Sequence, residues 1–213
     1  MYMIGAVSTD RRVLRSRSAL LRTAVRLVSE RGTTAIPVTD LAAAADVSRQ
    51  LVYLQFGDRD SLLVAAAADL VTRDLLQETY DDVRLGVLAT AQHFARHRPF
   101  YRPMLVGSCS YGMTRTMTGV FGPLNLRVLR ERFGDLDERT AADLSKFAAA
   151  GAGAIINDWL VDSPDPLDPQ EPADRLLRLS TVLTGGHDEP RQPRPPASVP
   201  PAGADVQGAG RQA

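Results

Sequence analysis

Cysteine and long apolar runs are both scarce in this chain of 213 residues. Cys109 is the single cysteine, so no internal disulfide can form, and we expect a cytoplasmic protein. No apolar run reaches the roughly 18 residues that a membrane-spanning helix needs. The short apolar patch at the N-terminus precedes the first basic residues, which is the reverse of a secretory signal. These absences favour a protein without membrane association.

Motifs of enzyme chemistry are also missing. The sequence contains no phosphate-binding glycine loop, no Gly-x-Ser-x-Gly elbow and no paired catalytic acids on a recognisable scaffold. His93 and His97 are spaced like a helical metal pair, but a HExxH glutamate and a nearby third Cys or His ligand are lacking. We therefore expect an exposed or core histidine pair, no metal, no cofactor and no catalysis. For Cys109, a buried thiol is expected over a redox sensor.

Alternation of apolar and polar residues over the length of a strand is absent as well, and helical periodicity replaces it. In the first predicted helix, residues 15–31, the apolar side chains form a single stripe, and Gly32 is a natural stop. Further helices are predicted over residues 58–76, 83–96, 100–109, 116–133, 138–161 and 172–183. The sequence predicts an all-α fold.

Net charge is zero, but the charges are not evenly distributed. Between Arg11 and Arg31 there are seven arginines and one acid, a net of +6. Between Asp135 and Asp174 there are ten acids and two bases, a net of −8. This distribution indicates that only the N-terminal region meets phosphate, unless the charges cluster by chance on solvated helices.

Two short helices are predicted over residues 38–45 and 49–56, with a tight turn at residues 46–48 between them. Apolar side chains recur at about one helical turn in each helix and would face inward. Ser48 occupies the N-cap position of the second helix, where its hydroxyl can accept a bond from an unpaired amide. Two helices joined by such a turn form a helix-turn-helix, whose second helix enters the DNA major groove.

At fixed spacing, this region and the start of the next helix carry a characteristic set of residues: Leu41, Ala42, Val47, Ser48, Tyr53, Phe56, Arg59, Leu62 and Leu63. The set resembles the TetR-type (tetracycline-repressor-like) bacterial transcriptional regulators over roughly residues 20–70. Asp46 replaces the usual turn glycine, Pro37 lies near the usual start of the first helix, and Arg59 stands where lysine is common. Asp tolerates a left-handed backbone at modest cost, and Pro suits a first helical turn.

The second helix of the pair would present Arg49, Gln50, Tyr53, Leu54 and Gln55 outward. Arg and Gln read guanine and adenine edges, so Arg49 and Gln50 are the predicted base contacts. The resemblance implies that Tyr53, Thr39 and Arg59 contact phosphates, and the predicted DNA-binding set also includes Ser48. Tyr53 as a packing residue and Gln55 as a solvated polar residue are the alternatives.

The resemblance also implies a ligand cavity and a dimer interface in the remaining helices. The predicted lining residues are aromatic residues and methionines, which also fill ordinary helical cores: Phe94, Phe100, Tyr101, Met104, Met113, Met117 and Phe121. Small residues at 148–154, together with the last helix, fit the family's four-helix dimer interface. Close packing within one subunit is the alternative.

The predicted organisation has four parts: an N-terminal arm (residues 1–13), a three-helix helix-turn-helix DNA-binding domain (14–60), a helical ligand-binding and dimerisation domain (61–184) and a disordered tail (185–213). The arm could reach DNA through its arginines or be a plain tail. We expect a homodimeric regulator, most simply a repressor, which binds a palindromic double-stranded DNA operator and is released by a small apolar ligand. The alternative is a helical interaction protein or apolar-ligand carrier. The sequence names neither operator, ligand nor regulated genes.

Overall fold

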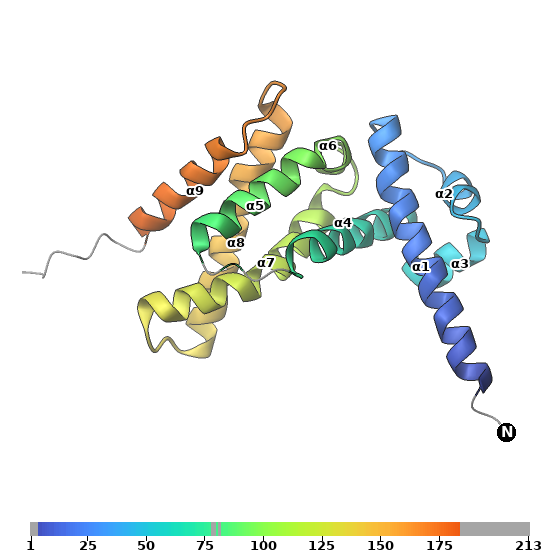
Figure 1. Cartoon of the computed structure of the whole chain (residues 1–213), viewed down its shortest axis with the longest axis horizontal. Helices are drawn as coiled ribbons and strands as arrows, with labels where there is room; N and C mark the ends of the chain where they lie inside the picture. Colours follow the sequence, from blue (N-terminus) through green and yellow to red (C-terminus); the bar gives the residue numbers. More distant parts are fainter. Residues whose placement is uncertain (1–3, 78–79, 81, 184–213) are drawn as a thin grey trace, which may run out of the picture.

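The computed structural model describes residues 4–77, 80 and 82–183, and within them helices joined by turns and loops are the only regular secondary structure (Figure 1). The helices of this described part are α1 (Ile4–Arg31), α2 (Val38–Ala44), α3 (Arg49–Phe56), α4 (Arg59–Leu75), α5 (Val83–Arg96), α6 (Arg98–Val106), α7 (Ser110–Phe133), α8 (Glu138–Asp162) and α9 (Gln170–Leu183). The predicted all-α class is confirmed. None of these helices combines the length and apolar character required to cross a bilayer. The predicted tail, residues 185–213, lies outside the described residues.

Helix α1 begins much earlier than predicted. An arm was expected over residues 1–13, but α1 starts at Ile4, and Figure 1 shows its first half extending beyond α3. The arm prediction is therefore wrong for residues 4–13. No proline interrupts this stretch, and each residue added to an existing helix closes one more backbone hydrogen bond. The helix ends at Arg31 as predicted, because Gly32 adopts a left-handed φ of +62°.

The helix-turn-helix is confirmed in its local detail. Helix α2 ends at Ala44, one residue before the predicted end, and Asp46 takes a left-handed φ of 54° in the turn. The Ser48 hydroxyl caps α3 by accepting a hydrogen bond from the Leu51 amide at 3.2 Å. Val52 is fully buried and fixes α3 to the core of the N-terminal region.

Helix α4 connects the two halves of the molecule. Asp58 caps its start by accepting a hydrogen bond from the Ser61 amide at 2.6 Å. Along its length α4 packs against α1, α3, α5 and α7 (Figure 1). Leu62, Leu63, Ala66 and Val71 are all fully buried along it. One continuous core therefore runs from the helix-turn-helix into the C-terminal helices.

Of the remaining helices, α5 and α7 pack directly against α4. Helix α6 starts at Arg98 rather than at residue 100, because Pro99 suits a first helical turn and does not break the chain there. Helix α7 begins at Ser110, six residues before the predicted start at Thr116. It packs extensively on α8, and α9 lies against α5 and α8.

Gly107 marks a close approach between the two halves of the fold. A Cβ built on it would lie 2.5 Å from Thr34 Oγ1 and 2.8 Å from the Pro103 carbonyl oxygen. Thr34 is buried in the segment between α1 and α2, so it has little room to move. We expect Gly107→Ala to lower the free energy of unfolding by about 1–3 kcal/mol.

Urea denaturation measures this effect, and Gly119→Ala is the matched control. Gly119 lies in α7 with nothing within 4 Å of an added Cβ. Alanine there should raise stability by about 0.5–1 kcal/mol, because glycine is entropically costly within a helix. If Gly107→Ala and Gly119→Ala change the free energy of unfolding equally, the predicted clash between the added Cβ at position 107 and Thr34 is wrong.

Candidate nucleic-acid interface and ligand cavity

The outward face of α3 consists of four exposed side chains: Arg49, Gln50, Tyr53 and Leu54. Tyr53 is 54% exposed and Leu54 is 81% exposed. Arg49 and Gln50 stand in the first turn, which is the part of a recognition helix that contacts base edges. Tyr53 does not pack in the core. The four residues form one surface that offers hydrogen-bonding groups and an apolar side chain suited to a thymine methyl group.

Gln55 was predicted on this face, and the structure corrects that prediction. Both polar atoms of its side-chain amide are buried and have no hydrogen-bond partner. Gln55 follows the buried Val52 by three residues, so the helical repeat places it on the inward side of α3. It is therefore removed from the predicted base-reading set.

Ser48 and Thr39 lie at the starts of the two short helices and are both exposed. The Ser48 hydroxyl is used as the α3 cap, and the Thr39 hydroxyl lies 3.4 Å from Asp40 Oδ1. Asp40 also pairs with Arg31 at 2.7 Å, which holds the end of α1 against α2. Both hydroxyl groups are near free helix-terminal amides, where a phosphate would be favoured.

Arg59 is engaged within the protein. Its Nε donates to Asp60 Oδ1 at 2.8 Å, and its Nη2 donates to Ser108 Oγ at 3.3 Å. Burial opposes ionisation of Asp60, but hydrogen bonds from Ser108 and Arg59 together hold the pKa of that carboxyl below its usual value. This pairing connects the start of α4 to the segment before α7, so the structure does not present Arg59 as a free phosphate ligand.

Arg17 was not singled out by the sequence, yet it supports α3. Its guanidinium carbon lies 4.5 Å from the centre of the Phe56 ring, a cation–π contact between α1 and the end of α3. Only the tertiary structure brings the two residues together, and no spacing in the sequence indicates the contact.

A cavity of about 510 Å³ lies among the C-terminal helices. Four of the seven predicted residues line it, namely Phe94, Met113, Met117 and Phe121. Polar groups from three helices add to the wall: Thr90, Thr114, Thr118, Asn125, Arg127 and Asn157. Its size and its mostly apolar wall are typical of small-molecule sites. Leu75 and Leu76, at the end of α4, also line it.

The other three predicted lining residues are placed elsewhere. Phe100, Tyr101 and Met104 are fully buried in the main core and do not line the cavity. They belong to α6, which packs against α1 and α8. The prediction was wrong for these three, because composition does not reveal which neighbours a helix faces.

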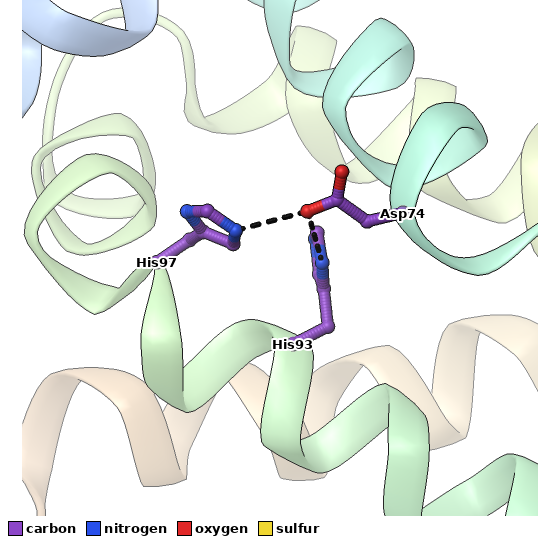
Figure 2. A group of neighbouring side chains, drawn as sticks. All are labelled: Asp74, His93 and His97. Atoms are coloured by element: carbon purple, nitrogen blue, oxygen red, sulfur yellow. Dashed lines mark hydrogen bonds and ion pairs between the residues drawn. The ribbon is translucent and has the colours of Figure 1, made fainter.

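His93 and His97 meet a third polar residue, Asp74 from the last turn of α4 (Figure 2). His93 Nδ1 lies 3.3 Å from Asp74 Oδ2, and His97 Nε2 lies 3.0 Å from the same oxygen. The far nitrogen of His93 is 2.8 Å from the Tyr101 hydroxyl. Burial, assisted by the neighbouring His97, lowers the pKa of His93 to about 4, so this ring is neutral at pH 7. Burial also raises the pKa of Tyr101.

The sequence search for a third ligand considered only cysteine and histidine nearby in the chain. It therefore missed Asp74, which is a carboxylate on a different helix.

Cys109 lies apart from this cluster. Its side chain is buried, and burial raises the pKa of the thiol to about 11, so the expected buried thiol is confirmed.

Helices α8 and α9 expose apolar and small side chains. Phe147 is 65% exposed and Val182 is 74% exposed. Gly151 follows Phe147 by one helical turn, and nothing lies within 4 Å of a Cβ built on it. The subunit's own packing therefore does not require a small residue at Gly151.

Comparison with known proteins finds relatives of both the sequence and the fold. The family described as "Bacterial regulatory proteins, tetR family" matches residues 20–66. The HTH-type transcriptional regulator BetI of Rhizobium meliloti is 33% identical over 75 residues. That match covers 35% of this chain and 34% of BetI, so it spans about a third of the relative.

Solved structures share the fold over most of the chain. FadR of Thermus thermophilus, a TetR family transcriptional repressor solved with lauroyl-CoA, has a TM-score of 0.59 at 21% identity, covering 85% of this chain and 100% of FadR. The TetR family repressor AlkX of Dietzia sp. has a TM-score of 0.51 at 20% identity, covering 78% and 94%. The chain therefore matches the TetR-type family of bacterial transcriptional regulators over residues 20–66, and its helical fold is similar to that of solved TetR family proteins.

Proposed function

We propose that this chain is a homodimeric DNA-binding repressor that a small, largely apolar ligand releases from a palindromic operator. One observation carries the proposal: a single helix, α4, supports the exposed reading surface of α3 at one end and lines the cavity at the other. Each subunit would place α3 in the major groove of one half-site. In this proposal the DNA-binding domain comprises residues 14–60, and the ligand-binding and dimerisation domain comprises residues 61–184.

The release step follows from the position of α4. A ligand that contacts Leu75 and Leu76 would favour one tilt of α4 and thereby one spacing of the two α3 helices in the dimer. It shifts the equilibrium only by its difference in affinity for the two arrangements. FadR was solved with lauroyl-CoA, so a fatty acyl chain is a reasonable first ligand class to test here.

Selection from randomised duplex DNA at near-physiological salt tests the regulator proposal. Recovery of one palindrome is expected, with half-sites one or more helical turns apart. Weak binding without a consensus, lost as salt is raised, would instead indicate phosphate contacts alone. That outcome would favour an apolar-ligand carrier, which uses the same cavity but does not read DNA.

Filling the cavity tests the ligand proposal. Gly153 lines the cavity, and nothing lies within 4 Å of an added Cβ, so a leucine side chain has room to enter. We expect Gly153→Leu to weaken binding of an apolar fluorescent probe or a fatty acyl ligand at least about tenfold, because it occupies part of the apolar volume.

Fluorescence titration measures this change, and Gly119→Leu is the control, since Gly119 is also open but does not line the cavity. If Gly153→Leu binds the probe as tightly as the wild type does, the probe binds outside this cavity.

A further inference from the structure

The cluster of Asp74, His93 and His97 combines three potential metal ligands from two helices. One possible ligand atom from each residue lies within 4.8 Å of the others. His97, the C-cap of α5, follows His93 by about one helical turn, and both rings point toward Asp74 (Figure 2). Two imidazoles and one carboxylate are ligands that suit zinc and other divalent transition metals, but not Mg²⁺ or Ca²⁺.

The separations also fit a small coordination sphere. Metal–ligand bonds of about 2.0–2.2 Å in a tetrahedral site place neighbouring ligand atoms about 3.3–3.6 Å apart. The His93 Nδ1 to Asp74 Oδ2 distance is 3.3 Å, and the His97 Nε2 to Asp74 Oδ2 distance is 3.0 Å. An ion therefore requires a slight opening of the His97–Asp74 contact, together with a separation of the two imidazole nitrogens, now within 4.8 Å, that matches the same range.

His93 offers its Nδ1 as a ligand atom inside this cluster. Its Nδ1 is buried and has no hydrogen-bond partner, although it lies beside the Asp74 carboxylate. The opposite ring nitrogen is held by Tyr101 at 2.8 Å. When that nitrogen carries the proton and donates to the Tyr101 hydroxyl, the Nδ1 lone pair points toward the carboxylate. Such a hydrogen bond to the outer ring nitrogen is the usual support for a metal-ligating histidine.

We propose that Asp74, His93 and His97 bind one divalent transition-metal ion, with Zn²⁺ as the representative ion. The ion joins the last turn of α4 to α5, and a water molecule or an exogenous ligand atom takes the fourth coordination position. Nothing in this assignment depends on DNA binding.

Access and charge both permit an ion to enter. The side chains of Asp74 and His97 are 27% and 23% exposed, so the cluster opens to solvent on that side. Two arginines lie near it. Arg73 is paired with Asp69 at 2.8 Å, and Arg96 is exposed on α5, where solvent screens its charge.

Titration of the full-length, tag-free, chelator-stripped protein with Zn²⁺ tests the site, and the visible absorption of bound Co²⁺ reports its coordination. One ion per chain is expected. Asp74→Asn and His97→Gln should weaken Zn²⁺ binding by about 100-fold or more, since each removes a ligand. Tyr101→Phe should weaken Zn²⁺ binding about tenfold, because it removes the hydrogen bond between the Tyr101 hydroxyl and the outer ring nitrogen of His93.

Two matched variants complete the experiment. Asp143→Asn removes an exposed carboxylate on α8, and His187→Gln removes the third histidine of the chain; neither should alter the affinity. The ion should raise the melting temperature of the wild type but not that of Asp74→Asn. No Zn²⁺ binding by the wild type, or equal affinity in the wild type and Asp74→Asn, would overturn the proposal. His93→Gln is not decisive, because His93 is buried.

Discussion

Replacing Arg49 and Gln50 together with alanine should weaken binding to the selected operator about 100-fold or more without unfolding the protein. Both side chains are exposed on the first turn of α3, so no core contact is lost. Each good bidentate contact to a base edge contributes about 1–3 kcal/mol of discrimination, and a dimer would lose the contacts in both half-sites. Binding to non-specific DNA should change much less.

Fluorescence anisotropy with operator and scrambled duplexes measures both affinities. Arg139→Ala is the matched control, because Arg139 is an exposed arginine in the first turn of α8. Figure 1 shows that end of α8 at the opposite side of the molecule from α3. Tyr53→Phe offers a second comparison: loss of a phosphate contact should weaken binding about equally on all sequences. If the double variant keeps its preference for the operator, α3 does not read the bases as proposed.

Phe147→Asp should convert the proposed homodimer into monomers and thereby abolish tight operator binding. The Phe147 ring is 65% exposed on α8, one turn before Gly151, where the subunit's own packing does not require a small residue. Burying a phenylalanine contributes about 1.5–3 kcal/mol, and a two-fold interface counts it twice. The substitution also places two carboxylates in an apolar contact, so the dimer dissociation constant should rise by about 1,000-fold or more.

Analytical ultracentrifugation over a range of concentrations measures this change. Tyr111→Asp is the control, since Tyr111 is 79% exposed at the start of α7 and lies outside the α8–α9 face. If the dimer persists in Phe147→Asp but dissociates in Tyr111→Asp, the interface lies on α7 rather than on α8 and α9.

Local sequence signals predicted the helix-turn-helix well. The bounds of α3, the Ser48 cap and the left-handed Asp46 depend on residues a few positions apart, and each matches the structure. The error at Gln55 is also local. Its three-residue offset from Val52 already indicates the inward side, and only its polarity suggested exposure.

Features that depend on the packing of distant helices could not be predicted in the same way. The predicted cavity residues divide according to their helix: those of α5 and α7 line the cavity, and those of α6 face α1 and α8. Asp74 joins the histidine pair only because α4 and α5 pack together. Neither arrangement produces a spacing or a periodicity in the sequence.

The last turn of α4 contributes to two sites through adjacent residues. Asp74 belongs to the histidine cluster, and Leu75 lines the cavity. The same adjacency recurs on α5, where His93 faces Asp74 and Phe94 lines the cavity. If an ion occupies the cluster, the two sites are thermodynamically linked. If the bound ion changes the affinity for the apolar ligand by some factor, the bound ligand must change the affinity for the ion by the same factor.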